Sequence, residues 1–173
     1  MPFLSNFARQ AKIRFFFHDV CKQASILEVG CGAGWLGSEL ARRGFSHYSG
    51  IDLEPPAGIV GDVRNWRNLG LSPASYDVVV AFEVIEHGDF FPAFDALLKP
   101  GGRLMLTSPL PHRDWLMQLL ESMGLNQRRT SPHTHLIYFT EITPFRPLVI
   151  RRVCGLAQWG IFEKPVRAEP LIC

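Results

Sequence analysis

The chain has 173 residues, the length of one domain, and 47% of them are hydrophobic while 20% are charged. This composition excludes a disordered chain and a coiled coil. The formal net charge is only +2 and the basic residues are scattered, so we expect a small-molecule partner and no nucleic acid. The four cysteines form no CxxC pair and have no zinc-finger spacing. We therefore expect no metal site, and reduced thiols in a cytoplasmic protein.

The amino-terminal segment is predicted to be an amphipathic helix over residues 5–23. Its apolar face would carry five side chains: Phe7, Ile13, Phe16, Phe17 and Val20. We expect this face to pack on the rest of the domain, because the longest apolar runs are far shorter than the roughly 20 residues of a membrane span. The amino terminus also lacks the cleavage pattern of a signal peptide. Residues 1–24 would be a docked helix and residues 25–173 the remainder of one domain, with no stable membrane anchor and an open oligomeric state.

From residue 25 onward, strand-like runs alternate with helical periodicity. Strands are expected at 25–29, 48–53, 59–60, 76–82 and 103–108, and helices at 35–43, 90–98 and 115–123. The run Val78-Val79-Val80 places β-branched residues on both faces of its strand, which is typical of a central parallel strand covered by helices on each side. The sequence therefore predicts an α/β fold, a single Rossmann-like, doubly wound and mostly parallel sheet with helices on both faces.

The carboxyl-terminal part carries weaker signals. Residues 148–154 and 161–166 predict two strands about seven residues apart, which indicates an antiparallel hairpin that closes the sheet. The segment 141–147 contains Pro144 and Pro147 and is not expected to form a long helix.

The segment Glu28-Val29-Gly30-Cys31-Gly32-Ala33-Gly34 is the strongest functional signal. Three alternate glycines between a strand and a helix allow a tight turn, bring a ligand against bare backbone and direct helix amides at it. The dinucleotide fingerprint requires its third glycine where this chain has Trp35. A ligand other than a pyrophosphate is therefore favoured.

Two acidic residues follow the next strands. Asp52 ends the second strand about twenty residues after the loop, where a carboxylate accepts hydrogen bonds from both hydroxyls of a ribose. Asp62 follows the third strand at the same edge of the sheet, the edge where open α/β sheets bind ligands. The alternative for each acid is a solvated side chain or a helix cap.

Several blocks in fixed order resemble the class I S-adenosylmethionine-dependent methyltransferases. The blocks are 26–34 (ILEVGCGAG), 50–53 (GIDL), 61–63 (GDV), 76–87 (YDVVVAFEVIEH) and 97–104 (LLKPGGRL). The last two are similar to the branch that contains the quinone-biosynthesis methyltransferases. The resemblance covers about half of the chain, and after Thr140 the sequence is shortened relative to that branch.

The resemblance implies a cofactor, S-adenosylmethionine, with S-adenosylhomocysteine as product. It implies that the methionine part lies on Glu28, Gly30, Cys31, Gly32 and Gly34. Asp52 would bind the ribose, Leu53 the adenine face, and Asp62 with the Val63 amide the adenine edge, while Phe82 and Glu83 would border the sulfonium. Cys31 is not expected to act as a nucleophile, because no base is evident beside it.

An oxygen or nitrogen acceptor must lose a proton, and a histidine, carboxylate or tyrosine at the pocket mouth is suited to take it. The candidates are His87, His112, His133, His135 and Tyr138. The segment 132–140 resembles the stretch of quinone-type relatives in which a histidine precedes an aromatic-Thr pair, which favours His135 as the catalytic residue. A structural role for His135 is the alternative. The pair His133-x-His135 would be only half of a metal site.

The leading hypothesis is thus a methyltransferase that acts on a small organic molecule, with the acceptor atom (O, N or C) undetermined. A non-catalytic S-adenosylmethionine-binding or regulatory module is the first alternative, because the carboxyl-terminal half is cropped. A nicotinamide-dependent oxidoreductase is the second, on the glycine loop and Asp52 alone. The familiar amino-methylating nucleic-acid enzymes are disfavoured, because the fourth strand lacks an Asn/Asp-Pro-Pro-aromatic block.

Overall fold

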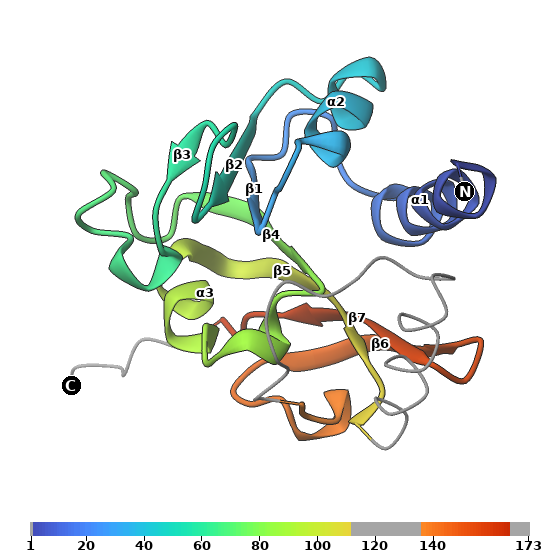
Figure 1. Cartoon of the computed structure of the whole chain (residues 1–173). Helices are drawn as coiled ribbons and strands as arrows, with labels where there is room; N and C mark the ends of the chain where they lie inside the picture. Colours follow the sequence, from blue (N-terminus) through green and yellow to red (C-terminus); the bar gives the residue numbers. More distant parts are fainter. Residues whose placement is uncertain (1, 112–135, 167–173) are drawn as a thin grey trace.

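The structure is a computed structural model that describes residues 2–111 and 136–166. Its described residues form one seven-stranded sheet in the order β3-β2-β1-β4-β5-β7-β6 (Figure 1). The strands are β1 Ile26–Val29, β2 Tyr48–Asp52, β3 Ile59–Val60, β4 Tyr76–Phe82, β5 Leu98–Pro109, β6 Arg146–Val153 and β7 Ala157–Glu163. The α-helices are α1 Pro2–Phe17, α2 Trp35–Arg42 and α3 Phe91–Leu97, and the short 3-10 turns are η1 Val63–Asn65, η2 Ile85–His87 and η4 Phe139–Glu141. The helix expected at 115–123 lies outside the described residues.

The pairing of the strands confirms the predicted fold class. Strands β1 to β5 pair in parallel, and β7 pairs antiparallel with both β5 and β6. The predicted antiparallel hairpin is therefore present, although β7 begins at Ala157, four residues before the expected start. Strand β4 is central as predicted, because it lies between β1 and β5.

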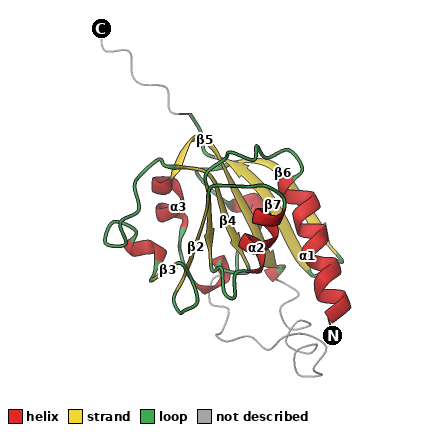
Figure 2. Ribbon diagram, turned by 90° about the horizontal axis from the view of Figure 1, so that it is seen from above, coloured by secondary structure: helices red, strands yellow, loops and turns green. Residues whose placement is uncertain are grey.

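Helices cover the two faces of the sheet. Successive side chains of β4 point to opposite faces and belong to two separate buried clusters. Val78 and Val80 belong to a buried cluster with side chains of α1 and α2. Val79 and Ala81 belong to a second buried cluster, which includes side chains of α3. Figure 2 shows α1 and α3 on opposite sides of the sheet. The β-branched run is thus buried on both faces, as expected for a central parallel strand.

Helix α1 packs on the sheet, but the predicted apolar face was too broad. Ile13, Phe16 and Phe17 are buried, whereas Phe7 is 76% exposed. At about 100° per residue, the nine positions between Phe7 and Phe16 place them on opposite sides of the helix. The helix also ends at Phe17 rather than at residue 23. Val20 therefore lies beyond the helix, where it is half-buried.

Strand β5 begins at Leu98, five residues before the expected start. Leu98 pairs with Tyr76, and the next pair is Val78 with Arg103, so the segment 99–102 bulges out of the ladder. Gly101 has a positive φ of 75°, and a Cβ at Gly102 would lie 2.8 Å from the carbonyl oxygen of Lys99. The two glycines therefore allow the bulge, and the strand follows α3 directly.

Strand β6 forms one edge of the sheet. Its apolar residues Leu148, Val149 and Ile150 are all exposed, as are the arginines on either side of them. In the two described ranges, no helix is both long enough and apolar enough to cross a membrane.

Candidate cofactor and active site

The glycine loop connects β1 to α2 and has the backbone that its sequence predicts. Gly30, Gly32 and Gly34 have φ values of 75°, 49° and 73°, a region that side chains disfavour. A Cβ at Gly30 would clash with Cγ2 of Val84, whereas a Cβ at Gly32 or Gly34 would meet no protein atom within 4 Å. Gly30 is therefore required by packing, and the other two present bare backbone to open space.

Asp52 lies directly beside this loop. Its Oδ2 accepts a hydrogen bond of 2.7 Å from the amide of Gly32. The amide of Gly30 donates to the carbonyl oxygen of Ile51 at 2.9 Å, so the loop is tied to the end of β2 at two points. Loop and carboxylate thus form one unit, as their spacing in the sequence indicates.

A cavity of about 330 Å³ opens at this carboxyl edge of the sheet. Seven of the residues predicted to bind a cofactor line it: Gly30, Asp52, Leu53, Asp62, Val63, Phe82 and Glu83. Leu53 is 69% exposed, so an apolar side chain is available at the mouth of the cavity. Two carboxylates and an exposed apolar side chain line one cavity, and the open backbone of Gly32 is hydrogen-bonded to Asp52 beside it. This arrangement fits an adenosine with an amino-acid tail.

Four of the residues predicted to bind a cofactor do not line the cavity: Glu28, Cys31, Gly32 and Gly34. Glu28 is buried, and the hydroxyl of Tyr48 donates a hydrogen bond to its Oε2. Burial raises the pKa of Glu28 to about 7, which the hydrogen bond from Tyr48 only partly offsets. Sequence reasoning missed Tyr48. A signal exists in Gly37 and Gly50, because a Cβ at either position would clash with the Tyr48 side chain.

Burial also raises the pKa of the Cys31 thiol, and the negative charges of Glu28 and Asp52 add to this effect. A protonated thiol is a poor nucleophile. The expectation that Cys31 has no nucleophilic role thus agrees with its surroundings.

Asp62 is a helix cap, one of the alternatives that the sequence left open, and it also lies at the cavity. Its Oδ1 accepts the amide of Arg64 at 2.9 Å and caps η1, while its side chain also lines the cavity. The Arg64 guanidinium binds both carboxylate oxygens and lowers the pKa of Asp62. Arg64 is itself 5.3 Å from the ring of Phe90, so it forms part of the same wall.

A polar cluster that was not predicted lies beyond Phe82. The Lys12 ammonium of α1 is 3.3 Å from Oε1 of Glu83 and 3.3 Å from Oγ1 of Thr107. Thr107 donates a hydrogen bond of 2.7 Å to the same Glu83 oxygen. Lys12 stands four residues before the buried Phe16, and a cation on the buried face of a helix is the signal that could have found it.

Glu86 is a second buried carboxyl near this cluster, with 1% of its surface exposed. Neither its Oε2 nor Oγ of Ser108 has a hydrogen-bond partner in the described part of the chain. Burial, reinforced by the negative charge of Glu83, raises the pKa of Glu86 to about 8. Glu86 is therefore largely a neutral acid at pH 7.

Of the four histidine candidates, His87 lies within the described residues and three lie outside them. His87 lines the cavity. His112, His133 and His135 lie outside those limits, so the role of His135 stays a prediction. Tyr138 is half-buried next to η4. Within residues 2–111 and 136–166, no three His, Cys, Asp or Glu side chains come together as a metal site would require.

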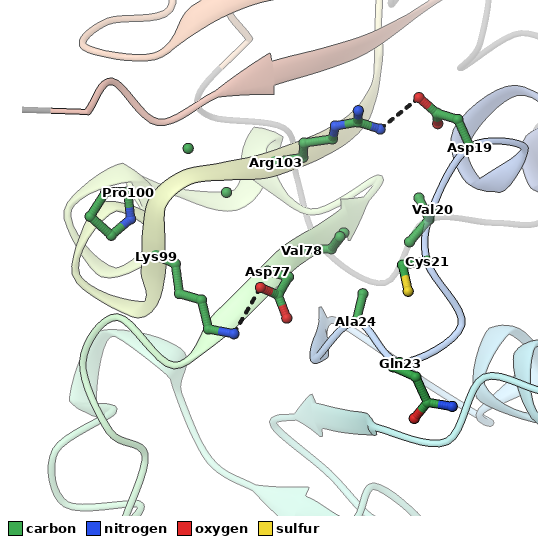
Figure 3. Close-up of a pocket in the computed structure, with 12 residues that line it drawn as sticks. Asp19, Val20, Cys21, Gln23, Ala24, Asp77, Val78, Lys99, Pro100 and Arg103 are labelled. Atoms are coloured by element: carbon green, nitrogen blue, oxygen red, sulfur yellow. Dashed lines mark hydrogen bonds and ion pairs between the residues drawn. The ribbon is translucent and has the colours of Figure 1, made fainter.

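A second cavity, of about 440 Å³, lies at the opposite edge of the sheet. Figure 3 shows its two cations directed at carboxylates. Lys99 is 2.7 Å from Asp77, and Arg103 is 2.9 Å from Asp19. Its charges are thus neutralised within the protein.

Comparisons with known proteins agree with the site. A family model described as a methyltransferase domain matches residues 4–143. The ubiquinone biosynthesis O-methyltransferase of Xylella fastidiosa is 38% identical over 103 residues, a match that covers 49% of this chain and 42% of that protein. The chain thus spans less than half of that relative's length.

Solved structures share the fold at low identity. A SAM-dependent methyltransferase of Methanosarcina mazei superimposes with a TM-score of 0.64 at 18% identity, covering 88% of this chain and 98% of the other. Geranyl diphosphate C-methyltransferase of Streptomyces coelicolor, solved with S-adenosyl-L-homocysteine, gives a TM-score of 0.61 at 14% identity, covering 92% of this chain and 79% of that one. The family match decides against the nicotinamide-dependent alternative.

Proposed function

The chain belongs to the class I S-adenosylmethionine-dependent methyltransferases, and on this premise we propose that it methylates an oxygen atom of a small phenolic molecule. The observation that carries the proposal is the 330 Å³ cavity, which Gly30, Asp52 and Asp62 line, with the open backbone of Gly32 hydrogen-bonded to Asp52 beside it. When bound, S-adenosylmethionine supplies an activated methyl group, so the protein has mainly to bind and align its partners.

The residues around the cavity have separate binding roles in this proposal. The amides of the loop face the amino-acid tail, and Asp52 accepts hydrogen bonds from the ribose hydroxyls. Leu53 covers one face of the adenine, and Asp62 accepts a bond from its amino group while Arg64 holds the carboxylate in place. Glu28 contributes indirectly, because it supports the loop through Tyr48.

An oxygen acceptor is favoured by two observations. The Xylella relative is named an O-methyltransferase of ubiquinone biosynthesis. The residues beyond Phe82 also include a carboxylate and an ammonium within 3.3 Å of each other, which are groups suited to a proton that must be removed.

The finer expectations from the sequence are kept as proposals. They are a cytoplasmic location, an amino-terminal segment 1–24 whose helix docks on the unit 25–173, and His135 as a catalytic residue. The eleven residues named from the sequence around the cofactor belong to the same set of proposals, with Glu28 acting through Tyr48 and Glu83 bordering the sulfonium without a bond to the cofactor.

The test combines binding with transfer. Calorimetry should show one molecule of S-adenosylhomocysteine bound per chain, and radiolabelled S-adenosylmethionine should label members of a panel of phenols and catechols. Amines and aliphatic alcohols serve as comparison acceptors. Binding without transfer to any phenol would contradict the proposed reaction and favour a non-catalytic module, while absence of binding would contradict the cofactor site itself.

A further inference from the structure

Lys12, Glu83 and Thr107, here called the acceptor-side cluster, join three elements that are remote in the sequence. Lys12 comes from α1, Glu83 follows β4, and Thr107 lies within β5. Thr107 is fully buried, and the Lys12 side chain is only 17% exposed. Two of these polar groups are thus withdrawn from water, which is costly unless they serve each other or a ligand.

The two carboxylate oxygens of Glu83 differ in their contacts. Lys12 and Thr107 both approach its Oε1, at 3.3 and 2.7 Å. No described residue makes a hydrogen bond or ion pair with Oε2, and the Glu83 side chain is 45% exposed where it lines the cavity. One oxygen is therefore fixed by the protein, and the other is available to a ligand.

The backbone at Glu83 is strained. Its φ is +57°, a value that non-glycine residues seldom adopt and that concentrates at functional sites. The amide of Glu83 donates to the carbonyl oxygen of Thr107 at 2.9 Å, which holds the residue in this conformation. A merely solvated glutamate would not need this conformation to be imposed on it.

Other charged groups surround the cluster. Glu28 below the loop and Glu86 after β4 both sense the charge of Lys12. His87 lines the same cavity, and Asp52 lies at the end of β2. The Lys12 ammonium also lies 4.9 Å from the ring centre of Phe82. From β5, the hydroxyl of Thr107 contacts both Lys12 and Glu83.

We propose, on the basis of the proposed function, that Glu83 removes the proton from a phenolic acceptor and that Lys12 and Thr107 position its carboxylate. A phenolic hydroxyl ionises near about pH 10, within reach of a carboxylate assisted by a cation, whereas an aliphatic alcohol is far less acidic. The cluster therefore selects acidic hydroxyl groups, with Phe82 beside it as an aromatic wall.

The step balances without a further reactant. The phenolic O–H bond breaks, and its proton moves to Oε2 of Glu83. The oxygen forms a bond to the methyl carbon as the carbon–sulfur bond breaks, and that electron pair stays on sulfur. Glu83 then releases the proton to water, while Lys12 faces the negative oxygen during the transfer.

The first experiment measures kcat and KM of the full chain with a phenol or catechol of the panel that the chain methylates. Glu83→Gln keeps the shape of the side chain but cannot take a proton. It should lower kcat about a hundredfold, with KM and the affinity for S-adenosylhomocysteine within about threefold of wild type. Glu54→Gln, an exposed glutamate at the same edge, is the matched control and should change neither constant.

Lys12→Met tests the positioning residue. The ammonium holds Oε1 of Glu83 in place and faces the oxygen that becomes negative, so its loss should lower kcat/KM about tenfold across the pH profile of the reaction. Lys12→Arg should restore most of the wild-type profile. Lys22→Met, which removes an exposed lysine stacked on Phe45, should leave the profile in place.

Binding of 4-nitrocatechol to the S-adenosylhomocysteine complex provides a readout without turnover. Lys12→Met should weaken this acidic probe about tenfold, whereas Glu83→Gln should bind it at least as well as wild type, because a negative charge has been removed. If the chain methylates no phenol, the proposed function is wrong. The binding of 4-nitrocatechol to the variants then decides by itself whether the acceptor-side cluster binds an acidic hydroxyl group. Wild-type kcat in Glu83→Gln, or a probe affinity that does not depend on Lys12, would overturn the inference.

Discussion

The two cavities at opposite edges of the sheet make an instructive pair. The one at the amino edge is larger, about 440 against 330 Å³, and it also contains acidic and basic side chains. Its cations are already bound to Asp77 and Asp19. At the carboxyl edge, by contrast, a non-glycine residue, Glu83, has a positive φ, and Gly32 and Gly34 face open space.

The difference shows that size and charge alone do not identify a binding site. Partial burial pushes the pKa of Asp77 up, but hydrogen bonds from Lys99 and Ser25 outweigh this effect and lower it. That carboxylate is stabilised by the protein itself. At the carboxyl edge the backbone of Glu83 is strained, and such strain concentrates at functional sites, so it is the feature that indicates a ligand.

The largest effect on cofactor affinity should come from Gly32→Val. The new side chain would project into the space that the ligand occupies, and we expect S-adenosylhomocysteine to bind at least about a hundredfold more weakly by calorimetry. Gly70→Val is the matched control, because Gly70 also has a positive φ and open space around it. The amide of Gly70 bonds to Arg67, which does not line the cavity, whereas the amide of Gly32 bonds to Asp52, which does. Both variants should lose a similar amount of stability, on the order of 1–2 kcal/mol, from backbone strain. Equal cofactor affinity in the two would remove the distinction between the cavities.

Asp52→Asn should have the next largest effect. Loss of charge-assisted bonds to two ribose hydroxyls should weaken S-adenosylhomocysteine about tenfold to a hundredfold. Asp77→Asn at the other edge should leave that affinity unchanged and lower the free energy of unfolding by about 1 kcal/mol, measured by urea denaturation. A change of cofactor affinity in Asp77→Asn would show that the amino-edge cavity is coupled to the site.

Glu86→Gln should have the smallest effect on cofactor affinity, within about twofold, but a clear one on stability against pH. The pKa of Glu86 is raised from 4.5 to about 8, so between these values the folded chain binds the extra proton and the unfolded chain does not. Wild-type stability should therefore fall as pH rises through this window, and the slope should be shallower in Glu86→Gln. Urea denaturation at pH 5, 6.5 and 8 measures the free energy of unfolding of both proteins. Equal slopes against pH would show that Glu86 does not have the raised pKa.

Much of the carboxyl edge was predictable because its signals are local. The bounds of β3 and β4 agree with those expected from the sequence, since the β-branched run of β4 is specific for a buried strand. The loop glycines were predictable because glycine adopts a positive φ more readily than other residues. Asp52 was predictable because it ends β2, the next strand after the loop, at the same edge of the sheet.

The acceptor-side cluster was not predictable in this way. Lys12 and Glu83 are separated by 71 positions and Lys12 and Thr107 by 95, so no local pattern joins them. The wrong placement of Phe7 has a related cause: a helix face was drawn broadly enough to include a residue half a turn away from its centre. Tertiary packing determines both the cluster and the position of Phe7, whereas the sequence shows only which residues are apolar and how they are spaced.

The edge strand β6 has a consequence for how this protein behaves in concentrated solution. Among the described strands β6 pairs only with β7, and an edge strand with Leu148, Val149 and Ile150 exposed is a template on which another chain can add its own strand and start an aggregate. The same strand carries Pro147, which lacks an amide donor, and exposed arginines at 146, 151 and 152, whose like charges repel a second copy. We expect that replacing these exposed arginines with neutral residues would leave the fold in place and raise the tendency of the chain to aggregate, because the charges on the edge strand oppose pairing with a second copy.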